Sequence, residues 1–122
     1  FDLKFIDSAR HRRYTGKGNE PILDNFRRLT QEAGGRVLPR VPLVPGITAT
    51  HGNLKEIASF LAELGYGRCD LLPYPPGGIE KRRSLGMKTP PGLPERSLRR
   101  EEEEELRKEF RKQLTRRLGT AA

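Results

Sequence analysis

Two charged side chains lie two residues apart in an apolar stretch at the start of the 122-residue sequence. In residues 1–6, Asp2 and Lys4 alternate with apolar residues, so an extended chain places both charges on one face. A charged face in apolar surroundings is costly unless it meets solvent, an ion pair or a ligand. Arg40 lies between apolar neighbours and favours an anionic partner such as a carboxylate. These three residues are candidates for binding a charged ligand, with an exposed edge or a salt bridge as the alternative.

Nucleophilic and metal-binding side chains are scarce in the sequence. Cys69 is the only cysteine, and His11 and His51 are the only histidines. Zinc and iron–sulfur sites need about three or four thiolates or imidazoles, so these residues cannot build one alone. Cys69 is expected to be a small buried hydrophobic residue in a reducing compartment. Both histidines are expected to be exposed loop residues, and no Ser-His-Asp or Cys-His set is visible.

Charge and hydropathy exclude further classes. The formal charge of +8 favours anionic partners. No aromatic residues alternate with the basic ones to stack on bases, so we interpret the charge as a solvated surface and expect no nucleic-acid partner. No apolar run approaches the ~20 residues of a membrane span, and no signal peptide is visible.

The elements that position the candidates are predicted from turn residues and apolar spacing. Extended segments are expected at residues 2–6, 36–44 and 68–74. Helices are expected at residues 8–14, 20–33 and 53–64. Asp7 and Asn53 are the expected caps of the first and third helices. Strands that alternate with helical crossovers lie parallel, and three such units are a slice of a larger parallel barrel.

The composition changes after residue 74. Residues 75–97 are rich in proline and glycine and are expected to form a long loop. Ser97 is expected to cap a charged helix over about residues 98–117, whose early glutamates and later basic residues suit the helix dipole and i,i+4 ion pairs. The helix also carries a narrow apolar stripe of Leu106, Phe110, Leu114 and Leu118. The sequence is divided accordingly into residues 1–88, a linker at 89–97 and a charged helix and tail at 98–122.

Residues 36–42 support an alternative function from a different class. They match the R-x-x-P-x-x-P form of a polyproline ligand for SH3 domains. The alternative is a non-catalytic interaction module that uses this segment and the basic surface. The position of the segment between two amphipathic helices favours burial instead. Prolines are unusual in a central strand unless the strand pairs on one side only at those positions.

Three stretches together resemble the glycyl-radical-enzyme activating proteins of the radical S-adenosylmethionine (SAM) superfamily, which are similar to pyruvate formate-lyase activating enzyme. The stretches are FDLKFIDSARHRRYTGKGNEPILDNFRRL from residue 1, RVPLVPGITATHGNL from residue 40 and LLPYPPGGIEKRRSLGMK from residue 71. The resemblance covers residues 1–88 and implies the C-terminal portion of a partial parallel (β/α) barrel of α/β class. The last helix has no clear counterpart in it.

The resemblance also implies cofactors and partners. A full-length enzyme of this family holds a [4Fe-4S] cluster and SAM, whose reductive cleavage gives a 5′-deoxyadenosyl radical. That radical abstracts a hydrogen from a glycine of a partner glycyl radical enzyme. An electron donor such as flavodoxin and a cytoplasmic location are implied as well.

Four residues of this sequence match positions that border SAM in the family. The resemblance implies that Lys4 holds the SAM carboxylate or ribose and that Asp2 contributes to the polar or cation-binding side. Arg40 matches the arginine of the R-x-P-L-x-P-G strand, near the carboxylate and sulfonium. Tyr74 belongs to a segment that borders SAM and the partner enzyme. No residue is implied to be catalytic or to bind metal.

The sequence departs from the family pattern in two ways. The C-x-x-x-C-x-x-C cluster motif and the glycine-rich SAM amine site, which precede the D-L-K strand in the family, are absent from these 122 residues. Pro75 stands where the family commonly has a histidine that contacts SAM. The chain is therefore expected to be inactive by itself, and three cysteines upstream of Phe1 would support the enzyme interpretation.

Overall fold

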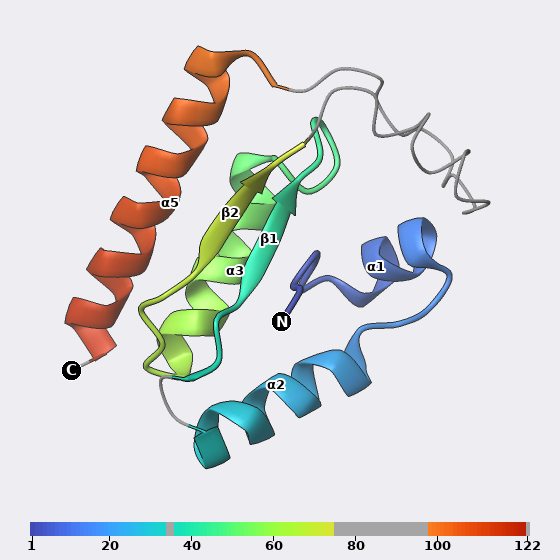
Figure 1. The fold of residues 1–122 in the computed structure, drawn as a ribbon, viewed down its shortest axis with the longest axis vertical. Helices are drawn as coiled ribbons and strands as arrows, with labels where there is room; N and C mark the ends of the chain where they lie inside the picture. The colour runs from blue at the N-terminus through green and yellow to red at the C-terminus, as the bar shows by residue number, and fades with distance from the viewer. Residues whose placement is uncertain (34–35, 75–97, 122) are drawn as a thin grey trace.

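The computed structural model describes residues 1–33, 36–74 and 98–121. Figure 1 shows the order of elements: α1 (Ser8–Thr15), α2 (Glu20–Ala33), β1 (Arg40–Leu43), α3 (His51–Glu63), β2 (Asp70–Pro73) and α5 (Arg100–Ala121). β1 and β2 pair in parallel, with Arg40 opposite Asp70 and Leu43 opposite Pro73. The expected α/β class with parallel strands is confirmed, and the barrel stays a prediction.

The first helix begins and ends where the sequence predicts. The Asp7 carboxylate accepts hydrogen bonds from the backbone N–H groups of Ala9 (2.9 Å) and Arg10 (3.3 Å). The helix ends at Gly16, whose φ of 83° favours glycine. α2 also has the predicted bounds. Local capping chemistry therefore specifies this part of the fold.

The predicted start of α3 was wrong by two residues. Its N-cap is Thr50, whose hydroxyl oxygen accepts a hydrogen bond from the Asn53 N–H at 3.1 Å. Asn53 therefore lies in the first turn, and its side chain is fully buried. The Asn53 amide serves a different purpose, which is described below.

The predicted strand at residues 2–6 is reduced to one parallel bridge between Asp2 and Arg40. The Leu3 N–H donates to the Arg40 carbonyl at 2.8 Å, and the Arg40 N–H donates to the Phe1 carbonyl at 2.7 Å. In a parallel ladder, the next bond on this side would come from the N–H of the residue at position 42. That residue is Pro42, which has no N–H.

The Pro42 carbonyl is also engaged elsewhere. It accepts hydrogen bonds from the Val44 N–H at 3.1 Å and from the Thr48 hydroxyl. Pro42 therefore offers neither an N–H nor a free carbonyl to residues 1–6, which we call the first segment. Pairing between the first segment and β1 stops after one bridge for this reason. Pro42 is tolerated in β1 because its missing N–H faces away from β2, as the one-sided pairing expected from the sequence requires.

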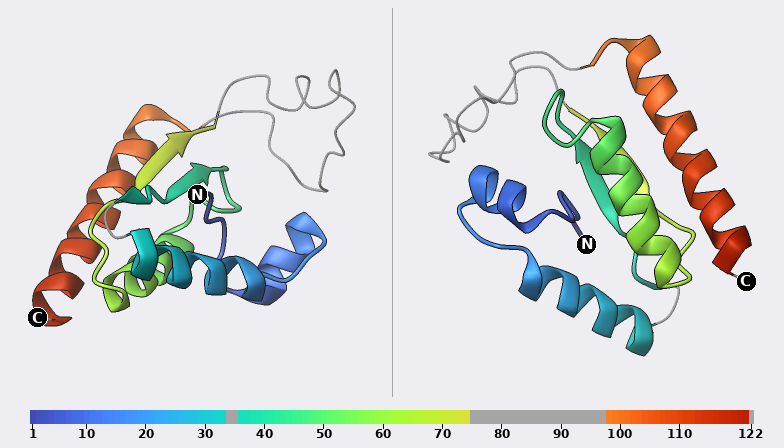
Figure 2. Two further views of the ribbon diagram at one scale, coloured as in Figure 1. Left: turned by 60° about the horizontal axis from the view of Figure 1, so that its bottom comes forward. Right: turned by 180° about the vertical axis from the view of Figure 1, so that it is seen from behind.

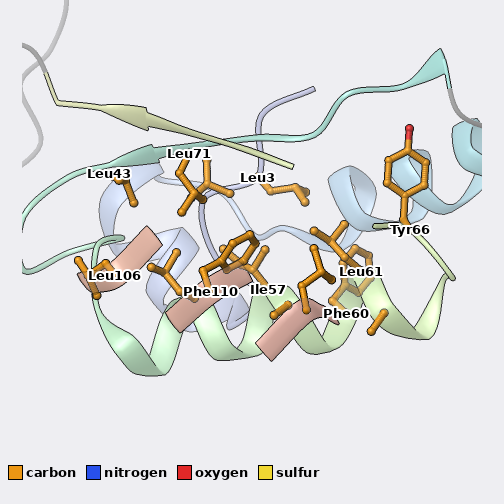
Figure 3. Packing of buried hydrophobic residues seen from close by; sticks show 14 of the residues in the cluster. Leu3, Leu43, Ile57, Phe60, Leu61, Tyr66, Leu71, Leu106 and Phe110 are labelled. Carbon is orange, nitrogen blue, oxygen red and sulfur yellow. The ribbon is translucent and has the colours of Figure 1, made fainter. Parts of the chain in front are cut away.

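The two faces of the sheet differ sharply. Leu3, Val41 and Leu71 are buried, whereas Asp2, Arg40 and Asp70 in the neighbouring row are exposed. Figure 2 shows α3 running along one face of β1 and β2. In Figure 3, Leu43 and Leu71 point from the strands toward Ile57 and Phe110 of the helices. The exposed row is therefore on the face opposite the core.

α5 docks on α3 through the stripe that the sequence predicts. Its residues Leu106, Phe110 and Leu114 are buried, and Leu118 is half-buried. Ion pairs join Arg107 to Glu103 at 3.5 Å and Arg100 to Glu104 at 3.2 Å, both at i,i+4 spacing. The solvated charged face is confirmed, while the predicted cap Ser97 lies outside the described residues. No helix in the described ranges is long and apolar enough to cross a membrane.

The polyproline interpretation of residues 36–42 does not agree with the structure. Pro39 is among the most deeply buried residues, Val41 is 0% exposed, and Pro42 lies in β1. An SH3 domain would need these side chains to be accessible. The segment is instead part of the core and sheet.

Replacement of Phe110 by alanine tests the docking of α5. The side chain is 5% exposed, so Phe110→Ala should lower the free energy of unfolding by about 3–5 kcal/mol in urea denaturation. Lys112→Ala, on the exposed side of the same helix, is the matched control and should change it by less than about 0.5 kcal/mol. Equal effects of the two substitutions would contradict the packing of α5 on α3.

Candidate functional site

Asp2 and Lys4 border a cleft of about 700 Å³ between the first segment, α1 and the start of α2. Pockets for small ligands usually measure about 300–1,000 Å³. The lining residues include cations and carboxylates, although most of the lining surface is apolar: Asp2, Lys4, His11, Arg12, Thr15, Lys17, Gly18, Glu20, Pro21 and Ile22. Such a lining suits a ligand that carries charges of both signs.

His11 is a buried wall of this cleft. It lies in α1 and is 5% exposed, so the expectation of an exposed loop residue was wrong. Its Nδ1 lies 2.6 Å from the Lys17 carbonyl oxygen, which can only accept, so Nδ1 carries a proton and donates. The Thr15 hydroxyl donates to the His11 carbonyl at 2.6 Å. The i,i+4 spacing of His11 and Thr15 was the sequence signal for this contact. His51, by contrast, is exposed as expected, although it begins α3.

Glu20 forms a fixed negative charge on the cleft wall. The Ser8 hydroxyl donates to its Oε1 at 2.7 Å, and this hydrogen bond, together with Glu20's own backbone N–H, lowers the pKa of the carboxyl. Gly18 lies against the same carboxylate, where a Cβ would collide with Glu20 Oε2. That oxygen is the end of a flexible side chain and can move aside, so the contact does not require glycine at this position.

Arg40 adjoins the cleft through Asp2 but does not line it. Its strand position lies between Asp2 on one side and Asp70 on the other, on the exposed face of the sheet. No ion pair within 4 Å joins Arg40 to either aspartate in the described part of the chain. Arg40 is therefore flanked by two aspartates in the backbone pairing and forms a short ion pair with neither of them.

Tyr74 is separate from the other three candidates. It directly follows β2, is 8% exposed and is absent from the cleft lining. The structure therefore places Asp2 and Lys4 in one cleft, pairs Arg40 with Asp2 beside that cleft, and leaves Tyr74 outside the cleft lining.

The loop after β1 is tightly ordered. The Val44 carbonyl accepts hydrogen bonds from the N–H groups of Ile47, Thr48 and Ala49 at 3.0–3.1 Å. Gly46 turns the chain with a φ of 71°. The Thr48 hydroxyl oxygen also accepts the Val44 N–H at 2.7 Å. This loop lies at the C-terminal end of β1, where ligands bind in parallel α/β proteins.

Cys69 is half-buried and unsuited to nucleophilic chemistry. Burial, with a smaller effect of the Asp70 charge, raises the pKa of its thiol from 9.0 to about 12. Because the folded pKa exceeds the unfolded one, the neutral thiol contributes to stability below about pH 9. That contribution is lost as the pH rises toward about 12. Among the described residues no group of three or more His, Cys, Asp or Glu could hold a metal ion.

Alkylation of Cys69 tests this assignment. A thiol with a pKa near 12 carries about 1,000-fold less thiolate at pH 8 than one at 9.0, so iodoacetamide should modify the folded chain about that much more slowly. The same chain unfolded in urea is the control. Equal rates in the two states, followed by mass spectrometry, would show that the thiol is ionised and accessible.

Comparisons with known proteins find similar sequences and a similar structure, although no family model matches the chain. It is 39% identical over 85 residues to the indoleacetate decarboxylase activating enzyme of Tractidigestivibacter scatoligenes, covering 70% of this chain and 27% of that protein. It is 36% identical over 86 residues to the pyruvate formate-lyase 2-activating enzyme of Escherichia coli K12, covering 70% and 29%. The choline trimethylamine-lyase activating enzyme of Oleidesulfovibrio alaskensis is 36% identical over 110 residues, covering 84% and 35%. The chain thus spans about a third of the length of these relatives.

A solved structure is similar along nearly the whole chain. A domain of pyruvate-formate lyase-activating enzyme from Bacteroides vulgatus matches with a TM-score of 0.61 and 30% identity, covering 95% of this chain and 60% of that one. Because α5 makes up 22 of the 122 residues, most of α5 has a counterpart there, contrary to the expectation from sequence. These likenesses show that the chain belongs to the family of glycyl-radical-enzyme activating enzymes.

Proposed function

We propose that this chain is part of an enzyme that activates a glycyl radical enzyme and that it supplies one wall of the SAM site. The observation that carries the proposal is the shared cleft of Asp2 and Lys4, with Arg40 paired beside Asp2. SAM presents a carboxylate, an ammonium and a sulfonium within a few bonds. A site with Lys4, Arg40 and Asp2 offers a partner for each sign of charge.

The roles proposed for the four residues follow from their charge and position. Lys4 binds the carboxylate or ribose of SAM, and Asp2 forms the cation-binding side. Arg40 approaches the carboxylate from the exposed row of the sheet. Tyr74 contributes only as part of a segment that borders the ligand and the partner, because it lies outside the cleft. SAM supplies, when bound and cleaved in such an enzyme, the group that abstracts a hydrogen atom from the partner's glycine.

The chain does not fit the [4Fe-4S] cluster of the proposed enzyme. Its single cysteine has a raised thiol pKa, and the described residues hold no candidate metal group. Cluster binding needs about three cysteine thiolates. We therefore assign the cluster to no residue of this chain and expect these 122 residues alone to generate no radical.

The wider setting is proposed as follows. Residues 1–88 belong to a partial parallel barrel and residues 98–122 are a charged helix and tail, whereas the linker predicted at residues 89–97 lies outside the residues that the structure describes. The charged row of Asp2, Arg40 and Asp70 supports this setting, because it lies on the sheet face opposite the core. The expected partner is a glycyl radical enzyme, with flavodoxin as an electron donor and the cytoplasm as the location.

Substitution of Lys4 tests the proposed SAM wall. Loss of a charge-assisted hydrogen bond costs about 1.5–3 kcal/mol, so Lys4→Met should weaken SAM binding at least tenfold in titrations followed by NMR. Lys55→Met, on the exposed side of α3, is the matched control and should leave the affinity unchanged. An affinity for SAM that is the same in both variants and in the unsubstituted chain would contradict the assignment of Lys4.

Anaerobic reconstitution tests the assignment of the cluster. After treatment with iron and sulfide, the chain should show no brown [4Fe-4S] absorption band and no stoichiometric iron. A stable cluster with four iron atoms per chain would overturn the conclusion that its ligands lie elsewhere.

A further inference from the structure

Three successive backbone carbonyls at the end of the D-L-K segment accept hydrogen bonds from two asparagine side chains. The Asn53 Nδ2 donates to the Lys4 carbonyl at 2.8 Å. The Asn19 Nδ2 donates to the carbonyls of Phe5 at 3.0 Å and Ile6 at 2.7 Å. These bonds replace the strand ladder, which Pro42 ends one step earlier.

Both asparagines are deeply buried. Asn53 is 0% exposed and Asn19 is 2% exposed. Polar side chains are kept at such positions only with hydrogen-bond partners, since an unpaired amide costs about 1–3 kcal/mol. Two buried amides that converge on one three-residue segment therefore form a specific connection between distant parts of the chain.

Chemistry fixes the orientation of the Asn53 amide. Its Nδ2 also donates to the Thr48 carbonyl at 3.0 Å, so both of its partners are acceptors. A flipped amide would set its oxygen against two carbonyl oxygens. The Asn53 Oδ1 is buried without a hydrogen-bond partner, which costs free energy of folding. In this orientation both hydrogen bonds of Nδ2 are formed.

The two amides attach the segment to different elements. Asn19 immediately precedes α2, and Asn53 lies in the first turn of α3. Through Thr48, Asn53 also reaches the ordered loop after β1. The backbone of Lys4 is thus held to α3 and to that loop, while its side chain lines the cleft beside Asp2.

We propose that Asn19 and Asn53 are positioning residues that hold the backbone of Lys4, Phe5 and Ile6, and so keep the Lys4 ammonium in the cleft with Asp2. The ligand of that ammonium rests on the function proposed above, whereas the hydrogen bonds themselves require no ligand. A role in packing alone is the alternative, and the two differ in their effect on the backbone of residues 4–6 and on the side chain of Lys4.

Asn53→Asp tests the hydrogen bonds without a change of side-chain volume. A protonated carboxyl can still donate one hydrogen bond, whereas the ionised form sets negative oxygens against two carbonyls. The pKa of the introduced carboxyl should therefore rise above about 3.9 in the folded state, so the variant is most stable at low pH and loses stability as the pH rises. Urea denaturation between pH 4 and 8 measures this.

Asn25→Asp is the matched control, because Asn25 is exposed on α2. Its stability relative to the unsubstituted chain should vary little over the same range. A pH profile of Asn53→Asp that parallels the control would overturn the proposal, since a buried carboxyl that faces two carbonyls must have a raised pKa. Asn19→Asp should behave as Asn53→Asp does and serves as the second variant.

Two further measurements connect the amides to Lys4. In ¹⁵N relaxation, Asn53→Leu should lower the backbone order parameters of residues 4–6 and leave those of α5 unchanged. A uniform change along the chain, or no change, counts against the proposal.

SAM affinity should fall at least tenfold in Asn53→Leu. When Asn53→Leu is combined with Lys4→Met, the affinity should fall no further than in Lys4→Met alone. Additive losses would show that Asn53 does not act through Lys4. If the unsubstituted chain binds no SAM, the proposed function fails, and the relaxation data still decide the role of the amides.

Discussion

The backbone of β1 forms hydrogen bonds on both of its sides, and the rest of the described structure depends on this pairing. One side of the strand pairs with β2 over Arg40–Leu43, and the other side pairs with Asp2 for a single bridge. Pro42 sets that limit because it has no N–H and its carbonyl is bound by Thr48 and Val44. The first segment is therefore aligned with the sheet but released from it after Leu3.

This release has consequences for the candidate site. Alternation along the paired strands sends Leu3, Val41 and Leu71 into the core and leaves the charged row on the opposite face. Beyond Leu3, side-chain amides replace the ladder, and the chain turns into α1, which forms the far wall of the cleft. A proline and two asparagines thus convert the end of a strand into the wall of the cleft.

The sequence was sufficient where local chemistry determines the structure. The carboxylate of Asp7, the glycine at position 16 and the four-residue stripe of α5 predict helices that the structure contains. It was insufficient where distant segments meet. Asn53 resembled a helix cap, and its actual partner, the Lys4 carbonyl, lies 49 residues away. His11 resembled a loop residue because its partner Lys17 and its contact with Phe5 appear only after the turn closes. The shared face of Asp2 and Lys4 followed from alternation, but the bridge of Arg40 to Asp2 and the position of Tyr74 outside the cleft lining did not.

The proposed function requires that Asp2, Lys4 and Arg40 bind SAM. Chemical-shift mapping of the ¹⁵N-labelled chain during titration with SAM tests it most directly. We expect the largest changes in chemical shift at Asp2, Lys4 and Arg40, and these changes should saturate as SAM is added. The signals of α5 should change little. Shifts that are absent, or that concentrate on α3 and α5 away from the cleft, would contradict the proposed function.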